Sequence, residues 1–251
     1  MRLRRLLAST AETRRFTRHA RSGQDLEPAL RDGRRLLLRG GHRDYHIFNR
    51  IFLRDSYRVA ALPGPLGCVL DVGANTGLFA CYVAPWSQRV ICYEPSPGNF
   101  DVLLHNIQDY DHVSAHRAAL ASVEGSAYLH GARSGEFSLY PNPAMGETGP
   151  AVPVQTVTLD GVFEEHGISR CNLLKLDIEG AEYATLYAAS GTTLSRIDAI
   201  HGEYHRLDHP QPEANIAGLR AFLAGHGFRT RAVASKRKPG QGRFFARRLR
   251  L

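Results

Sequence analysis

The sequence predicts an α/β protein built around a mostly parallel β-sheet with helices on both faces. After residue 65, short apolar runs suited to buried strands alternate with stretches in which apolar residues recur at helical spacing. A glycine-containing turn joins the first of these strand patterns to the first helix pattern. Hydrophobic residues make up 43% and charged residues 22% of the 251 residues, which is typical of a folded chain that can bury a core.

The residues before this alternating region are predicted to form an N-terminal helical appendage, 1–62. Pro63-Gly64-Pro65 marks its boundary with the main domain, 63–251. Apolar residues of the appendage show helical spacing at 3–7, 26–38 and 45–52. We expect its aromatic residues to pack on the sheet, with a lid over the substrate pocket as the alternative. These residues are Tyr45, Phe48, Phe52 and Tyr57.

Within the main domain, strand and helix patterns follow one another in the order expected of a parallel sheet. Ser96 and Pro97 are a typical N-cap and first residue for the second helix. Buried strands are predicted at 69–72, 90–93, 173–178 and 199–204. Helices are predicted at 78–83, 97–108, 159–166, 180–190 and 212–224. Shorter strands are predicted at 127–130, 137–140 and 152–156, in an inserted hairpin region, and at 228–234 and 243–249, in a final hairpin.

The positive charge of the chain is concentrated at its two ends. The formal net charge is +8, but residues 1–22 carry +6 and residues 228–251 carry +9, which leaves residues 23–227 at −7. An enzyme acting on nucleic acid more often carries basic residues on its catalytic domain, where phosphate contacts position the reaction. The distribution therefore disfavours nucleic acid as a partner. The basic ends are either simply solvated, or they dock to an acidic carrier, a membrane surface or an anionic substrate.

Cysteine usage and hydropathy predict a cytoplasmic protein. The longest stretch without a charged residue, 72–88, contains glycine, asparagine and proline, so no transmembrane helix is expected. Only three of the 32 basic residues are lysines, which suggests a GC-rich bacterial genome, although the Arg-rich start resembles an organellar transit peptide. No cysteine pair has the spacing of a zinc site or a redox motif, so we expect reduced thiols at Cys68, Cys81, Cys92 and Cys171.

A nucleoside-binding turn is predicted between the first strand and first helix of the main domain. Gly73 and Gly77 allow close approach of a ligand and positive φ, which Asn75 also tolerates. The spacing lacks the G-x-G-x-x-G pattern of dinucleotide folds, so NAD is disfavoured. A carboxylate at Asp71, a ribose-binding carboxylate at Glu94 and a turn without basic residues suit a cationic nucleoside such as S-adenosylmethionine. The alternative is that the glycines only form a tight strand–helix corner.

Together, these segments resemble FkbM-type S-adenosylmethionine-dependent methyltransferases. The resemblance covers about residues 57–250, and its most specific part is the string LKLDIEGAE. It departs from the family's pattern at Gly202, where an apolar residue is more usual, and in the long basic N-terminus. The matching segments are DVGANTG (71–77), YEPSP (93–97), LKLDIEGAE (174–182) and EYH (203–205), with lesser matches at 124–125 and 157–160.

This resemblance implies a class I methyltransferase fold, which is Rossmann-like, with a mostly parallel seven-stranded sheet whose last strand is antiparallel. It also implies methyl transfer, commonly to a hydroxyl of a secondary metabolite or glycan. The residues expected to hold S-adenosylmethionine are Asp71, Gly73, Ala74, Asn75, Gly77, Glu94, Pro95 and Ala118.

Polar residues alternate with apolar ones on two strands predicted to be neighbours. Residues two apart on a strand share a face, so each set is expected to lie together if its strand persists. Because ligands bind at the carboxyl edge of open α/β sheets, the two strand ends form a candidate acceptor site. One strand carries Lys175, Asp177 and Glu179, and the other carries His201, Glu203 and His205.

Methyl transfer from a sulfonium requires alignment of the acceptor and removal of its proton. We expect Asp177 to lie nearest the methyl group, with His205 or Glu203 as proton acceptor. Structural alternatives are a helix cap for Asp177, a salt bridge for Lys175, and a hydrogen bond between Glu203 and His205. A divalent metal held by Asp177, Glu179 and His205 is a further hypothesis, since carboxylates and imidazole bind such ions.

The sequence therefore favours a methyltransferase that acts on a hydroxyl of a small molecule, a secondary metabolite or sugar. Two alternatives remain open at this point. The first is methylation of RNA or a carrier-bound substrate held by the basic termini. The second is a non-catalytic protein that binds a nucleoside as a scaffold.

Overall fold

The core of the protein is a seven-stranded sheet with the order β10-β11-β9-β8-β1-β2-β3. The computed structural model describes residues 3, 6–131, 137–139, 151–205, 214–236 and 238–249. Strand β11 is antiparallel to both neighbours, and the other pairs are parallel, so the predicted fold class is confirmed. The strands are Leu66–Val72 (β1), Ser87–Tyr93 (β2), Val113–His116 (β3), Leu173–Leu176 (β8), Ala199–Tyr204 (β9), Phe228–Ala234 (β10) and Gly242–Arg248 (β11).

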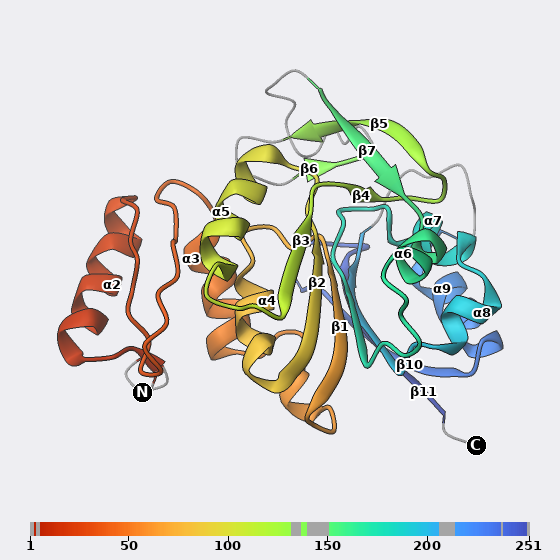
Figure 1. Cartoon of the computed structure of the whole chain (residues 1–251), viewed down its shortest axis with the longest axis horizontal. Coiled ribbons are helices and arrows are strands. Elements are labelled where there is room, and N and C mark those ends of the chain that lie inside the picture. The colour runs from red at the N-terminus through yellow and green to blue at the C-terminus, as the bar shows by residue number, and fades with distance from the viewer. Residues whose placement is uncertain are drawn as a thin grey trace.

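Helices cover both faces of this sheet (Figure 1). Leu70 and Val72 pack with α6 to α9 on one face, whereas Val69 packs with α4, α5 and the N-terminal region on the other. Burial on both faces is why the parallel strands are continuous apolar runs in the sequence. None of the helices in the described ranges has the length and apolar character needed to cross a membrane. The helices are Leu78–Val83 (α4), Pro97–Ile107 (α5), Leu159–Glu165 (α6), Glu182–Ala188 (α7), Gly191–Ser195 (α8) and Ile216–Gly225 (α9).

A second, smaller sheet with the order β4-β7-β5-β6 lies over one edge of the first (Figure 1). It corresponds to the inserted hairpin region predicted from the sequence, although Tyr140 of that prediction lies outside the described residues. The Ser138 hydroxyl donates a hydrogen bond to the Glu179 carbonyl oxygen at 2.8 Å, which ties this sheet to the loop after β8. Its strands are Ala119–Leu120 (β4), Gly125–Gly131 (β5), Phe137–Ser138 (β6) and Val152–Val157 (β7).

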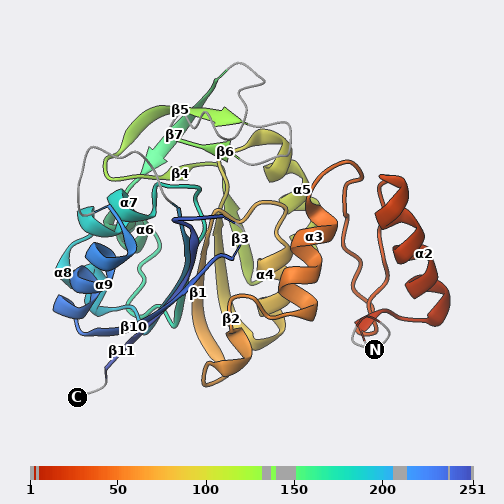
Figure 2. The same ribbon diagram turned by 180° about the vertical axis from the view of Figure 1, so that it is seen from behind.

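The N-terminal region shares a hydrophobic cluster with α4, α5 and the main sheet. Its aromatic residues Tyr45, Phe48 and Tyr57 are buried there and Phe52 is half-buried against the same cluster, while Tyr57 also borders a cavity. Helix α2 lies at the outer end of the molecule, on the opposite side from the β10–β11 hairpin (Figures 1 and 2). The described elements of this region are the helices Thr10–Ser22 (α2) and Asp44–Phe48 (α3), the π-helical turn Asn49–Leu53 (η1) and the 3-10 turn Val59–Ala61 (η2).

The helix predicted at 26–38 is wrong, because this segment folds back on itself. The backbone groups of Leu26 and Leu38 exchange two hydrogen bonds of 2.9 Å, and Ala29 forms a bridge with Arg35. Gly33 turns the chain at a φ of +88°. Its left-handed conformation interrupts the helical spacing of the leucines, whose side chains reach the core from the turn instead.

Several boundaries also differ from the sequence prediction near the candidate site. Strand β8 ends at Leu176 rather than at 178, and α7 begins at Glu182 rather than at 180. Between them, Glu179 and Gly180 have positive φ values of +49° and +113°, which neither a strand nor a helix contains. Strand β3 was not predicted, since its short sequence is only half buried.

Gly202, the departure from the family's pattern, is explained by close packing within β9. A Cβ atom at this position would lie 2.4 Å from the carbonyl oxygen of Leu176 and 2.8 Å from the ring of Phe244. The buried Phe244 ring occupies the space that a side chain would need. Glycine at position 202 therefore allows β8, β9 and β11 to pack together beneath the candidate site.

Candidate active site

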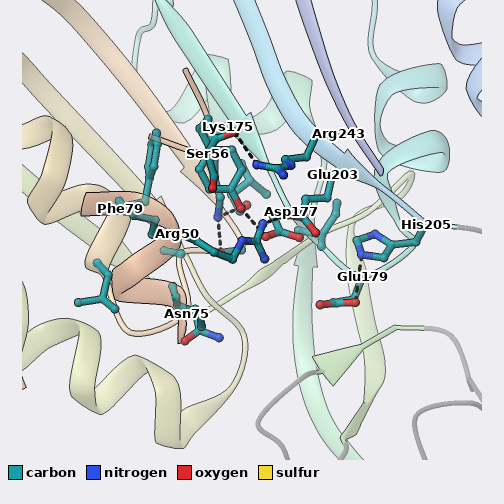
Figure 3. Close-up of a pocket in the computed structure, with 18 of the residues that line it drawn as sticks. Arg50, Ser56, Asn75, Phe79, Lys175, Asp177, Glu179, Glu203, His205 and Arg243 are labelled. Carbon is teal, nitrogen blue, oxygen red and sulfur yellow. Dashed lines mark hydrogen bonds and ion pairs between the residues drawn. The ribbon is translucent and has the colours of Figure 1, made fainter. Parts of the chain in front are cut away.

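A cavity of about 1010 Å³ lies at the carboxyl-terminal edge of the main sheet. One end is lined by the turn after β1 and by the residues that follow β2. The other end is lined by the loops after β8 and β9, residues 50–58 of the N-terminal region and the β10–β11 hairpin, whereas Arg39 bonds to Asn99 beside the first end. Ligands of open α/β sheets bind at this edge. Figure 3 shows Asn75 at one end of this space and Asp177, Glu203 and His205 toward the other.

The turn after β1 lies directly against the loop that follows β8. Gly73 has a φ of +73°, and a Cβ atom there would lie only 1.9 Å from the Asp177 carbonyl oxygen. The amide groups of Gly73 and Ala74 both donate to the carbonyl oxygen of Tyr93, at 2.9 and 3.0 Å. Asn75 adopts a φ of +52°. Small side chains and left-handed backbone thus keep this turn close to the sheet and open toward the cavity.

Glu94 lies at the end of β2 and faces the same cavity, with only 5% of its surface exposed. Its carboxylate accepts hydrogen bonds from the amides of Asn75, at 2.8 Å, and Ser96, at 2.9 Å. Burial raises the pKa of Glu94, although these two hydrogen bonds act in the opposite direction. Each oxygen retains a lone pair for a ligand hydroxyl. Pro95 and Ala118 line the cavity beside it, as expected.

Asp71 and Gly77 do not reach the cavity. Asp71 is a fully buried residue of β1 and forms an ion pair of 3.0 Å with Lys175. Gly77 has a φ of +77° at the start of α4, and its missing Cβ makes room for the Leu103 side chain of α5. The sequence placed both residues in the cofactor site, whereas the structure gives them supporting positions behind the turn.

Lys175, one of the expected catalytic residues, holds the turn after β1 in place. Its ammonium group donates to the carbonyl oxygens of Gly73, at 2.6 Å, and Val72, at 3.3 Å, in addition to its ion pair with Asp71. The side chain is almost fully buried. These contacts occupy its three donors, so Lys175 positions the turn rather than offering a free group to a substrate.

Asp177 combines a fixed orientation with an oxygen that has no partner among the described residues. Its Oδ2 accepts a hydrogen bond of 2.6 Å from the hydroxyl of Tyr57, while its buried Oδ1 has no hydrogen-bond partner among the described residues. Burial alone would raise the pKa of this carboxyl. The cations Lys175, His205 and Arg50, with the Tyr57 hydroxyl, outweigh burial and hold the pKa of Asp177 below its ordinary value. Asp177 is therefore ionised at neutral pH.

His205 lies between two carboxylates just beyond the end of β9. Its Nδ1 is 2.8 Å from Glu182 and its Nε2 is 3.2 Å from Glu179 (Figure 3). Burial alone would lower the pKa of His205, but the carboxylates of Glu182, Glu179 and Asp177 outweigh burial and raise the pKa to about 10. A protonated imidazole with both nitrogens engaged does not suit the proton-accepting role expected for His205.

This arrangement predicts that stability depends on pH through His205. The pKa of His205 is raised on folding, so its contribution is complete below about 6.5, its ordinary value, and is lost as the pH rises through about 10. The difference in unfolding free energy between the wild type and His205→Gln is expected to shrink, by an amount on the order of a few kcal/mol, between these pH values. Urea denaturation at several pH values measures it. A His42→Gln control, at an exposed residue, is expected to show no such trend. A difference that stays constant would contradict the charged state of His205.

The N-terminal region contributes to the site in a way that sequence reasoning missed. Arg50 forms an ion pair with Glu203, and Tyr57 bonds to Asp177 as described above. Arg243 of β11 donates to the carbonyl oxygen of Ser56 at 3.1 Å (Figure 3). No local sequence signal indicates these contacts, because they join residues more than 100 positions apart.

The described side chains offer a poor site for the hypothesised divalent metal. Ligand atoms of Asp177, Glu203 and His205 do lie within 4.8 Å of one another. However, both ring nitrogens of His205 already contact the carboxylates of Glu182 and Glu179, and Glu203 forms an ion pair with Arg50. Glu179 contacts His205 instead of joining Asp177. The donor set is therefore that of an ion-pair network.

Comparison with known proteins identifies relatives of this chain. The domain family described as "Methyltransferase FkbM domain" matches residues 71–230. "Methyltransferase sdnD" of Sordaria araneosa is 29% identical over 220 residues, covering 72% of this chain and 81% of that protein. "31-O-demethyl-FK506 methyltransferase FkbM" of Streptomyces tacrolimicus is 26% identical over 211 residues, covering 72% and 78%. The crystal structure of methyltransferase FkbM from Methylobacillus flagellatus KT matches with a TM-score of 0.53 at 14% identity, covering 81% of this chain and 50% of that chain, and so shares its fold.

Proposed function

This chain belongs to the FkbM methyltransferase family, and from this premise we propose that it methylates a hydroxyl of a small molecule, a secondary metabolite or a sugar, with S-adenosylmethionine as donor. One observation carries the proposal. The Asp177 amide donates to the Val72 carbonyl oxygen at 3.1 Å, and Gly73 leaves room for the Asp177 backbone. A polar acceptor cluster therefore lies directly beside a nucleoside-binding turn. The Streptomyces relative, named for an O-demethyl substrate, supports a hydroxyl as acceptor.

The residues at one end of the cavity fit the cofactor. Glu94 presents two carboxylate oxygens that suit the hydroxyls of a ribose, and Ala74 and Asn75 border the same space with small or polar side chains. No basic residue lies on the turn itself, as suits a ligand without phosphates. When bound, S-adenosylmethionine supplies a methyl group activated by a sulfonium.

Asp177 is the proposed proton acceptor at the other end. Its free Oδ1 accepts a hydrogen bond from the acceptor hydroxyl and orients the oxygen lone pair for attack. As the new carbon–oxygen bond forms, the hydroxyl proton becomes acidic and passes to Asp177, so a carboxylate of low pKa is a sufficient base. Tyr57 holds the other oxygen of Asp177 throughout. Two neighbouring groups set the charge around Asp177. Glu203 forms an ion pair with Arg50, and the protonated His205 favours the ionised form of Asp177.

Calorimetric titration with S-adenosylmethionine tests the cofactor assignment. We expect Glu94→Gln to weaken binding roughly 10- to 100-fold, because the amide loses charge-assisted hydrogen bonds and its NH2 group cannot accept from the amide of Asn75 or Ser96. Asp101→Asn is the matched control, since it removes a carboxylate from the exposed side of the helix that follows Glu94. Absence of S-adenosylmethionine binding to the wild type would contradict the proposed function.

A further inference from the structure

The charged residues that line the cavity are more often basic than acidic. Of the described residues that line the whole cavity, ten are Arg or Lys and six are Asp or Glu. The excess of basic residues in the cavity does not reflect the charge of the main part of the chain, because residues 23–227 carry a net charge of −7. It arises because the basic C-terminal segment folds into the β10–β11 hairpin beside the cavity, whereas none of the described residues before Arg39 lines it.

Most acidic residues of the cavity wall already have partners, although Oδ1 of Asp177 has none among the described residues. Glu203 pairs with Arg50, Glu179 pairs with His205, and Asp55 accepts hydrogen bonds from the amides of Val59 and Ala60. Because these carboxylates are already engaged, they do little to neutralise the other basic residues of the wall. The remaining basic side chains must therefore be balanced by solvent ions or by a ligand.

Three arginines from two distant parts of the chain supply the unbalanced charge. Arg54 comes from the N-terminal segment, and Arg231 and Arg243 come from the β10–β11 hairpin. No described carboxylate lies within ion-pair distance of any of them. Arg243 is the cross-strand neighbour of Glu203, but Glu203 forms its ion pair with Arg50 instead. Arg243 donates a hydrogen bond to the Ser56 carbonyl oxygen.

Arg243 has other arginines among its charged neighbours. Burial lowers the pKa of Arg243, and the neighbouring Arg50 and Arg54 lower it further, while Tyr57 and Asp177 act in the opposite direction. An anion that binds among these arginines would offset their mutual repulsion. Guanidinium groups are also suited to bidentate recognition of carboxylate and phosphate.

We propose that the acceptor molecule carries an acidic group, a carboxylate or a phosphate, that binds Arg243 and Arg54 while its hydroxyl lies at Asp177. This inference rests on the proposed function and adds the substrate class. Arg243 contacts the backbone of the segment that contains Tyr57, so the anion site and the proton acceptor are joined through Ser56 and Tyr57. Arg231 and the lysines of the hairpin, Lys236 and Lys238, attract the anion to the opening of the cavity.

The test compares three probes that share one sugar ring and differ in the group at its sixth carbon. Glucose, glucuronate and glucose 6-phosphate are titrated into the protein saturated with S-adenosylhomocysteine, and each dissociation constant is measured by calorimetry. We expect glucuronate, glucose 6-phosphate or both to bind at least tenfold more tightly than glucose. The stronger of the two distinguishes a carboxylate site from a phosphate site.

Variants then assign the effect to the arginines. The double variant Arg54→Gln/Arg243→Gln is expected to lose at least tenfold in affinity for the preferred acidic probe, with no more than a twofold change for S-adenosylhomocysteine. Arg229→Gln removes the same charge from an exposed residue of β10 that does not line the cavity, and it is expected to change neither affinity. Thermal denaturation confirms that the variants remain folded.

The possible outcomes test the anion site and the proposed function separately. Equal binding of all three probes, binding of none of them, or an acidic preference that survives the double variant would overturn the anion site. If S-adenosylhomocysteine itself does not bind, the proposed function fails, and the same three probes are then titrated into the free protein. An acidic preference that still depends on Arg54 and Arg243 would uphold the anion site independently.

Discussion

An Asp177→Asn variant is expected to bind S-adenosylmethionine almost normally and to lose roughly 10²- to 10⁴-fold in kcat. The asparagine oxygen can still accept the 2.6 Å hydrogen bond from Tyr57, so the local fold is preserved. What disappears is the ionised oxygen that receives the hydroxyl proton. The measurement is release of S-adenosylhomocysteine with an acceptor that the wild type methylates, together with calorimetric binding of the cofactor.

Tyr57→Phe is the matched comparison for this variant. It removes the hydroxyl that orients Asp177 but keeps the carboxylate, so its loss in kcat should be smaller than that of Asp177→Asn. The fully buried Tyr57 packs edge-on against Phe79, and the phenylalanine ring retains this contact. An Asp177→Asn variant with wild-type kcat would show that Asp177 only supports the structure and that the proton leaves by another route.

Gly73→Ala is expected to lower the free energy of unfolding by about 3 kcal/mol or more and to weaken cofactor binding. The added methyl group would lie 1.9 Å from a backbone oxygen, which no side-chain rotation relieves, and alanine is strained at a φ of +73°. For a chain of this size, the corresponding fall in melting temperature is roughly 6–12 °C. Thermal unfolding followed by circular dichroism measures it.

Gly98→Ala is the control for this substitution. Gly98 lies in the first turn of α5, has no positive φ, and has no atom within 4 Å of the position that a Cβ would take. We expect this variant to be as stable as the wild type or slightly more stable, because alanine favours helix. Similar melting temperatures for the two variants would show that the turn after β1 can move away from the β8 loop.

Local patterns in the sequence predicted several residues that border one end of the cavity. Gly73, Asn75 and Glu94 are close in sequence, and their positions follow from strand ends and a glycine turn. Asp71 was predicted as a ligand because its carboxylate lies next to the turn in the sequence and because of the family resemblance, whereas in the structure this carboxylate lies inside the sheet against Lys175. The turn and the β2 end could be predicted because both depend on short-range geometry.

The acceptor end could be predicted only in part. Spacing along β8 and β9 brought Asp177, Glu203 and His205 together correctly, but it did not reveal that Glu182 and Glu179 enclose His205. The contacts of Tyr57 and Arg50 depend on how the N-terminal region packs across the sheet. Such packing is set by the sum of many apolar contacts, so one sequence without relatives gives no signal for it.

The position of β11 also determines when this enzyme can be completed during synthesis. Within the main sheet, β10 pairs only with β11, and β11 alone joins it to β9. A nascent chain that has not yet added residues 242–248 therefore has no place in the sheet for β10, and its cavity lacks the lining residues that β10 and β11 supply. Because β11 must insert between two strands made earlier, this non-local pairing is expected to be a late step in folding. During synthesis, the strands that carry the turn after β1 and the loop after β8 are thus complete before the hairpin that contributes Arg231 and Arg243 to the cavity.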